Sequence, residues 1–278
     1  MPSYGVAMVN RPRTRRSVLS SFVGLVSVLG LLTQSSAAAA TTSGGANYQP
    51  LPASVRHEIR AVPAKVLRSV GKGDGANAPK RVNQKLRKNG HPEVAYILGE
   101  FCPYCAAESW IAVVALSRFG AFHNLTTLTS APNEGSLSSL QTVSFRYSHY
   151  TSRYLAFDPI VNEDVHLRHV ESVPARLRKV WKHDDGGFGG YPFVDFAGRA
   201  IQTSSPFNPR VLRGLSRAQI ATDLAKPRSA VARAIDGGAN EFTAATCLAT
   251  KNKPAKVCAR KPVKALERSL KPLHHSTD

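Results

Sequence analysis

The sequence CPYC at residues 102–105 restricts the fold of this chain more than any other feature, because of what lies on either side of it. Residues 94–98 are apolar and end at Gly99, which is typical of a short buried strand. Residues 106–119 carry apolar side chains at helical spacing and contain neither glycine nor proline. The sequence therefore predicts a strand, a turn and a helix, with both cysteines in the first helical turn.

The first turn of a helix favours a thiolate, because its backbone N–H groups lack partners within the helix and the helix dipole is positive there. Cys102 at the tip is predicted to be the exposed nucleophile with a low pKa. Cys105, one turn later, is placed to resolve or close a disulfide, and Pro103 suits a helix start. These residues predict a redox-active dithiol that needs no cofactor beyond the Cys102–Cys105 disulfide.

Two other interpretations of this motif stay open. A CxxC pair can be half of a zinc site, but a structural zinc site needs four Cys or His ligands, and Cys247 and Cys258 lie far along the chain at a different spacing. A structural disulfide across two residues would close almost no loop and would stabilise little.

The first 40 residues have the pattern of an export signal. Basic residues between positions 11 and 16 precede the apolar stretch 18–32, and small residues follow at 35–40. The apolar stretch is shorter than a typical membrane-spanning helix, which favours a signal peptide over an anchor that stays uncleaved. We expect an extracytoplasmic protein, secreted or associated with the cell envelope, by the general or the twin-arginine route.

Outside the cytoplasm disulfides persist, which bears on the other two cysteines. Cys247 and Cys258 are close in sequence and are predicted to form a structural disulfide around a basic loop. With Cys102 and Cys105 as the redox pair, all four cysteines are then used.

The chain has a net charge of +19, which could serve either binding to an anionic partner or solubility. The excess of basic residues is concentrated in residues 56–88 and 251–271. Neither stretch contains an aromatic residue, whereas single-stranded nucleic-acid sites usually combine basic and aromatic side chains. The charge therefore predicts no nucleic-acid partner, and it indicates either a soluble cationic surface that faces anionic envelope polymers or a compositional bias of the lineage. The 42% of hydrophobic residues is enough for a folded core.

We predict four parts along the chain: the signal 1–40, a disordered linker 41–52, a domain 53–262 and a basic tail 263–278. Within the domain, helical turns broken at Pro63 come first, and a strand over 81–88 turns at 89–90 into residues 94–98. Later segments are predicted as strands at 125–129, in the core, and at 142–147 and 154–157, as a helix from 172 to 181, and as helices at 216–224, 229–234 and 241–248.

A hairpin is predicted over residues 191–202, with a turn at 197–198. Pro192 stands at its entry, which is the position in a strand where proline is tolerated.

Together, the strand–CPYC–helix unit and the later sequence YPFVDFxG resemble the thioredoxin superfamily. More narrowly, GEFCPYCAAE at 99–108 and ALSRFG at 115–120 resemble the DUF929 family of thioredoxin-like proteins, with similar stretches between about residues 60 and 260. The resemblance implies an α/β, thioredoxin-like fold with an inserted segment and a helical C-terminal extension.

The resemblance also implies roles for individual residues. Cys102 would be the attacking sulfur and Cys105 the resolving one, while Pro192 would be a cis-proline that pairs with the substrate backbone. Tyr191 would present its carbonyl and N–H to that substrate. Phe101 stands where thioredoxins carry a tryptophan, and the glutathione-binding pattern of glutaredoxins is not recognisable.

Several other polar and aromatic residues are expected to be structural. Glu100 and Glu108 flank the dithiol and are predicted to lie on a solvated face, with proton transfer as the alternative. His123 is expected at the surface or as a cap, and Trp110 and Trp181 in the core.

The sequence as a whole predicts an extracytoplasmic thiol–disulfide oxidoreductase. Its partners would be exported protein thiols or a membrane redox partner, and no metal site is expected. The alternatives are a non-catalytic thioredoxin-like binding module, or a copper-handling protein that uses the two thiolates as soft ligands. Copper handling is less favoured because the only methionines, Met1 and Met8, lie in the signal.

Overall fold

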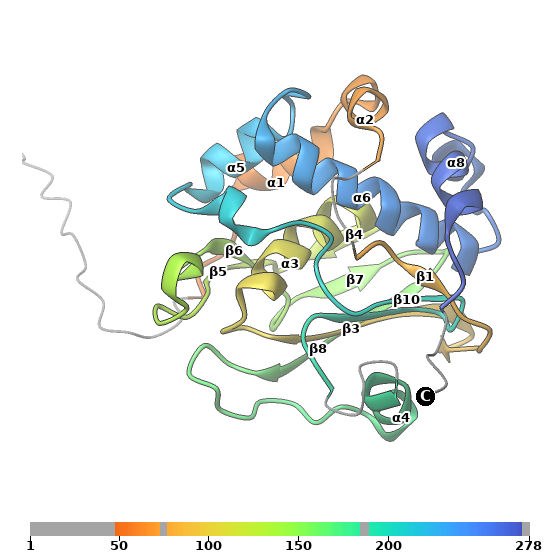
Figure 1. The fold of residues 1–278 in the computed structure, drawn as a ribbon, viewed down its shortest axis with the longest axis horizontal. Coiled ribbons are helices and arrows are strands. Elements are labelled where there is room, and N and C mark those ends of the chain that lie inside the picture. Colours follow the sequence, from red (N-terminus) through yellow and green to blue (C-terminus); the bar gives the residue numbers. More distant parts are fainter. Residues whose placement is uncertain (1–47, 73–76, 184–188, 274–278) are drawn as a thin grey trace, which may run out of the picture. The chain divides into compact units, whose positions relative to one another are not determined.

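The computed structural model describes residues 48–72, 77–183 and 189–273 (Figure 1). The predicted signal 1–40 and residues 41–47 of the predicted linker lie outside the described residues. Residues 184–188, in a glycine-rich stretch of the sequence, and the last five residues, 274–278, also lie outside the described residues.

The centre of the fold is a mixed six-stranded β-sheet built around one strand, β3. This strand runs parallel to β8 on one side and antiparallel to β9 on the other. A short strand, β2, pairs with the start of β3 through a tight turn at Asn89 and Gly90, where both residues have positive φ. The members of the sheet are β1 (Lys80–Arg81), β10 (Ala200–Gln202), β9 (Phe193–Phe196), β3 (His91–Gly99), β8 (Ala156–Glu163) and β2 (Arg87–Lys88).

Alternating side chains of β3 enter two separate apolar layers. Tyr96 and Leu98 join the layer that contains helices α3 (Pro103–Leu116) and α6 (Ala230–Ala249). Ile97 points to the opposite layer, which α4 (Ala175–His183) covers below the sheet in Figure 1. The sheet therefore has helices on both faces, which explains why residues 94–98 are all apolar and almost completely buried. The α/β class predicted from the sequence is confirmed.

The segment between α3 and β8 forms two short antiparallel ribbons. One ribbon pairs β4 (Ala121–His123) with β7 (His149–Thr151), and the other pairs β5 (Thr126–Thr129) with β6 (Gln141–Ser144), with the short 3₁₀ helix η1 (Gly135–Leu137) between β5 and β6. The strand predicted in the core at 125–129 is present as β5, with Leu125 and Leu128 buried, and it pairs within its ribbon and not with the central sheet.

The predicted strand at 154–157 is longer and begins later than expected, since β8 runs over Ala156–Glu163. It contains Pro159, a residue that the sequence pattern treats as a strand end. Within the sheet β8 pairs only with β3, so it is an edge strand, and an edge strand can hold a proline that has no N–H to donate.

One long helix replaces two predicted short ones in the C-terminal part. The segments predicted at 229–234 and 241–248 belong to the single helix α6, which continues through Gly237 and Gly238. A Cβ on Gly238 would stand 2.5 Å from Cδ1 of Ile111 on α3, so the glycine is needed for close packing of the two helices and does not end α6. The remaining helices are α1 (Ala53–Ala61), α2 (Ala64–Val70), η2 (Pro209–Leu212), α5 (Arg217–Asp223), α7 (Ala255–Cys258) and α8 (Lys261–Ser269).

Both predicted boundaries of the domain need correction. Leu51 is 1% exposed and its N–H donates to the carbonyl oxygen of Leu125, so residues 48–52 pack on the ribbon β5–β6 and are not a disordered linker. At the other end, α8 buries Val263 and Leu266, and the N–H of Leu273 donates to the carbonyl oxygen of Arg81. Burial of apolar side chains therefore places residues 263–273 in the domain and not in a tail.

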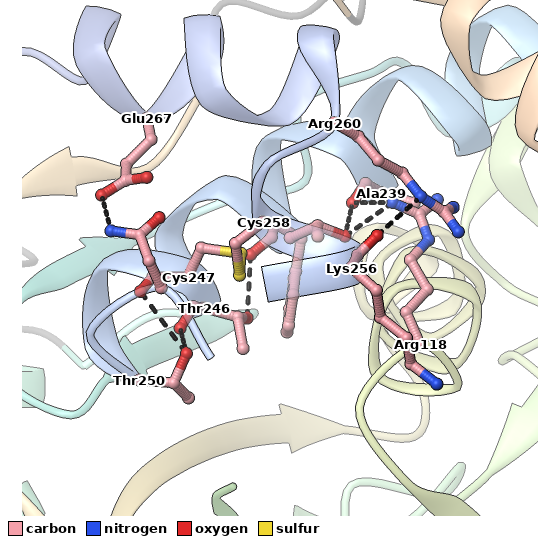
Figure 2. Close-up of a disulfide and its surroundings, with 12 residues drawn as sticks. Arg118, Ala239, Thr246, Cys247, Thr250, Lys256, Cys258, Arg260 and Glu267 are labelled. Atoms are coloured by element: carbon pink, nitrogen blue, oxygen red, sulfur yellow. Dashed lines mark hydrogen bonds between the residues drawn. A yellow bond between two sulfur atoms is a disulfide. The ribbon is translucent and has the colours of Figure 1, made fainter. Parts of the chain in front are cut away.

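Cys247 and Cys258 form a disulfide, the pairing that the sequence predicts. Their Cα atoms are 5.6 Å apart, and the bond connects the last turns of α6 to the short helix α7 (Figure 2). In the same view the hydroxyl of Thr250 donates to the carbonyl oxygen of Thr246 and ends α6. The disulfide thus fixes the point where the chain leaves α6 and returns toward α8.

The double substitution Cys247→Ala and Cys258→Ala should lower the free energy of unfolding by about 2–4 kcal/mol, because it removes a cross-link that restricts the unfolded chain. Urea unfolding followed by circular dichroism measures this change. The matched pair Cys102→Ala and Cys105→Ala, which removes no cross-link from the reduced protein, is the control, and equal stability of the two double variants would contradict the prediction.

Candidate functional site

Cys102 and Cys105 occupy the first turn of α3, as the sequence predicts. Cys102 is the N-cap residue, and its Sγ accepts a hydrogen bond from the backbone N–H of Cys105 at 3.4 Å. Pro103 is the first helical residue, where a missing N–H has no cost. Both cysteines are free thiols, 8% and 1% exposed. The prediction that Cys102 is exposed was wrong, because the fold packs both cysteines into the core; Cys102 keeps slightly more exposed surface than Cys105.

The environment shifts the pKa values of the two sulfurs in opposite directions. A hydrogen bond from the Cys105 thiol, with help from the backbone N–H groups of Cys105 and Tyr104, lowers the pKa of Cys102 against the effect of burial. Burial, followed by the neighbouring Cys102 sulfur, raises the pKa of Cys105 well above its usual value. Of the two sulfurs, Cys102 is therefore the one that ionises more readily.

Tyr191 and Pro192 lie beside Cys102, although they are about 90 residues away in the chain. The Sγ of Cys102 is 3.9 Å from the carbonyl oxygen of Tyr191, to which its thiol form donates. The Tyr191–Pro192 peptide bond is cis, and β9 begins at the next residue, Phe193. The structure thus brings together the four residues that the sequence singles out for this site.

Three aromatic rings surround the same corner. The ring of Tyr191 packs edge-on against Phe101 at 6.0 Å and stacks on Trp181 of α4 at 5.8 Å. The hydroxyl of Tyr191 donates to the side-chain oxygen of Asn162. These contacts hold the turn before Pro192 between the dithiol and α4, and they give Trp181 a part in the site as well as in the core.

Two side chains that sequence reasoning missed hold the first turn of α3. The hydroxyl of Tyr96 on β3 donates to the carbonyl oxygen of Cys105 at 3.0 Å, and the hydroxyl of Thr142 on β6 donates to that of Ala106 at 2.7 Å. Tyr96 is a polar group inside the predicted apolar strand, so it was a usable signal. Thr142 carried none, because only the folded ribbon brings it to the helix.

Glu100 and Glu108 were predicted on a solvated face, and both predictions were wrong. They are 1% and 0% exposed. Glu100 accepts hydrogen bonds from Ser144 at 2.7 Å and from Tyr48, and Arg146 lies 3.8 Å away. Burial raises the pKa of Glu100 against these partners. The prediction failed because the inserted ribbon covers this side of the dithiol.

Glu108 lies one turn after Cys105, inside the packing between α3 and the rest of the domain. Its carboxyl accepts a hydrogen bond from the side-chain amide of Gln202 at 2.8 Å. Burial raises the pKa of Glu108 to about 8, and the carboxyl of Glu241 on α6 adds to the effect. Glu108 is therefore mainly protonated below about pH 8, and its charge, where it forms, raises the pKa of Cys105.

Other candidate groups lie away from the dithiol. His123 is exposed on β4 and stacks on His149 at 4.4 Å. Within residues 48–72, 77–183 and 189–273, no three His, Cys, Asp or Glu side chains converge as a metal-ligand group. A search of the same residues finds no helix with the length and apolar character needed to cross a membrane.

Comparison with known proteins identifies part of this chain. Residues 77–177 match the family model described as Domain of unknown function (DUF929). The match includes Cys102 and Cys105 and ends before Tyr191, Pro192 and the Cys247–Cys258 disulfide. The resemblance to DUF929 is thus confirmed over residues 77–177, a shorter stretch than the sequence motifs suggested. No match was found among curated proteins or among solved structures.

The pKa of Cys102 should rise when Cys105 is replaced by alanine, because the thiol of Cys105 is the main group that lowers it. The rate of iodoacetamide alkylation at Cys102 against pH, read by intact mass, gives this pKa. Glu134→Gln is the control with the opposite sign, because the Glu134 carboxylate raises the pKa of Cys102. An unchanged profile in Cys105→Ala would contradict the assignment.

Stability should fall as pH rises from about 4.5 to about 8, since the native protein keeps a proton on Glu108 that the unfolded chain releases. One such group contributes at most about 1.4 kcal/mol per pH unit. Glu108→Gln should flatten this part of the profile. Asp236 and Glu241, whose pKa values burial raises to about 7, leave a residual slope of the same sign. Parallel wild-type and Glu108→Gln profiles in urea unfolding between pH 5 and 8 would refute the prediction.

Proposed function

We propose that this protein is a thiol–disulfide oxidoreductase with a thioredoxin-like fold. The path β3–α3–β8–α4–β9–β10 supports the fold: a dithiol helix follows the central strand, a parallel strand lies beside it, and a hairpin begins directly after Pro192. The inserted ribbons and the helices after β10 correspond to the insertion and the C-terminal extension. This arrangement of strands around the dithiol supports the proposed class of protein.

One observation carries the proposed activity: the thiol at the cap of α3 has a lowered pKa and faces the carbonyl of Tyr191, next to Pro192. A sulfur placed in this way can attack a disulfide, while its partner stays protonated until it is needed.

The exchange proceeds in two balanced steps. The Cys102 thiolate attacks one sulfur of a substrate disulfide, forming a mixed disulfide and releasing the other substrate sulfur, which takes up a proton. Cys105 then loses its proton, attacks the Sγ of Cys102 and releases the second substrate thiol. The protein ends as the Cys102–Cys105 disulfide and the substrate has gained two electrons and two protons. The reverse sequence oxidises a substrate dithiol, and a second thiol or disulfide partner restores the starting form.

We propose that the substrates are exported proteins or a membrane redox partner. The signal pattern of residues 1–40 supports a location outside the cytoplasm, and the Cys247–Cys258 disulfide supports an oxidising environment. An extended substrate would lie along the turn at Tyr191 and Pro192 and pair with its backbone, in the manner of an added β-strand.

Cys102→Ser should abolish both insulin reduction with a dithiol donor and oxidation of a reduced unfolded protein, because no attacking sulfur remains. Cys105→Ser should instead accumulate a mixed disulfide at Cys102, detected by non-reducing electrophoresis and mass spectrometry, because the resolving sulfur is missing. The double alanine variant at 247 and 258 is the control and should keep its turnover. Activity in Cys102→Ser equal to that of the wild type would overturn the proposal, and binding without turnover in the wild type would favour a non-catalytic module.

A further inference from the structure

A groove that includes Tyr104, the second residue after Cys102, is not used by the exchange steps, and neither cysteine of the dithiol lines it. It has a volume of about 490 Å³, in the range of ligand sites, and Tyr104, between the two cysteines, forms part of its wall. The ring of Tyr104 is 37% exposed; within the described residues, the other large hydrophobic side chains exposed to this degree are Tyr147 and Leu167. An exposed aromatic ring at the reactive sulfur needs a physical reason.

The other walls of the groove come from the segment after β10 and from the start of α6. The apolar part consists of Pro206, Phe207, Val211, Ala230 and Ala234. Pro206 and Phe207 are themselves buried, so the wall is a fixed part of the fold and not a set of loose side chains. The groove therefore offers a preformed apolar surface that begins at Tyr104, between the two cysteines in sequence.

The charge of the groove has one sign. Among the described residues that line it, Arg233, one turn into α6, is the one charged side chain, and none is acidic. One Nη of Arg233 donates to the carbonyl oxygen of Arg228 at 2.6 Å, which orients the guanidinium. In the described part of the chain, no carboxylate lies within ion-pair distance of Arg233. An occupant with an apolar body and a negative charge would complement both features.

We propose that this groove selects the polypeptide substrate of the dithiol, binding a segment in which an apolar side chain and an acidic residue flank the reacting cysteine. The proposal rests on the thiol–disulfide exchange proposed above and adds the class of substrate. The apolar side chain packs against Tyr104 and Phe207, and the carboxylate lies against Arg233. Because these contacts form before sulfur attack and do not touch the reacting atoms, they act on substrate binding and leave the chemical step unchanged.

The test uses four cysteine peptides of equal length, each as its mixed disulfide with thionitrobenzoate, whose release is coloured. Each peptide carries one pair of flanking residues: Leu with Asp, Leu with Lys, Ser with Asp, or Ser with Lys. The same pair stands on both sides of the cysteine, so that the result does not depend on the direction in which the peptide binds. The reduced protein should react with the Leu–Asp peptide about five- to tenfold more efficiently than with the Leu–Lys or Ser–Asp peptide, through a lower KM.

Two variants report on the groove without touching the dithiol. Arg233→Glu should reverse the preference between Leu–Asp and Leu–Lys, and a carboxylate in the first turn of α6 favours folding. Ala230→Trp should fill the groove and raise KM for every peptide, with no change in the reaction with a small neutral disulfide. Arg228→Glu is the matched control, because Arg228 is exposed nearby and does not line the groove, so its effect should stay within about twofold.

The possible results distinguish a failure of the groove proposal from a failure of the proposed exchange activity. Equal reactivity with all four peptides, or equal effects of Arg233→Glu and Arg228→Glu, would overturn the groove while the exchange activity stands. Faster reaction with a small acidic disulfide than with the Leu–Asp peptide would also overturn it, since the occupant is then a small thiol. If no disulfide reacts, the proposed function fails. The groove is then tested alone, by measuring the binding of the same peptides with serine in place of cysteine to the Cys102→Ser variant. Tighter binding of the Leu–Asp peptide would support the groove, and equal binding of all four peptides would reject it.

Discussion

The rest of the candidate site depends on the junction between β3 and α3. A helix that starts at the end of a buried strand leaves backbone N–H groups without partners, and here the sulfur of Cys102 accepts one of them. The turn is held from below by Tyr96 and from the side by Thr142, which bond to the carbonyls of Cys105 and Ala106. Because this turn is fixed on two sides, the two chemically identical cysteines acquire different environments and different pKa values.

The polar groups around the dithiol are buried to an unusual degree. Glu100 is surrounded by partners from the N-terminal segment and the inserted ribbon, including Tyr48 and Ser144. Glu108 is enclosed between α3 and the rest of the domain with Gln202 as its hydrogen-bond donor. A buried carboxyl favours its neutral form, so the surroundings of the dithiol gain negative charge only as pH rises. Stability and thiol chemistry are therefore linked to pH through the same groups.

Local patterns predicted the elements that depend on short-range chemistry. The strand before CPYC, the helix after it, the hairpin entered at Pro192 and the disulfide between Cys247 and Cys258 all agree with the structure. Patterns failed where long-range packing decides. Pro159 lies in a strand because that strand is at an edge, and Gly238 lies within a helix because Ile111 needs the space. Neither the edge position of that strand nor the contact between Gly238 and Ile111 can be predicted from the residues adjacent in sequence.

By itself, the sequence determined the chemistry of the candidate site: two thiols one helical turn apart, at a position where backbone N–H groups and the helix dipole favour a thiolate. Only the tertiary structure decided which groups surround them. It placed the carbonyl of Tyr191 against Cys102, buried Glu108 and put Arg233 in the groove next to Tyr104. The physical reason is that capping and periodicity act within a few residues, whereas burial and charge pairing depend on segments that meet only when the chain has folded.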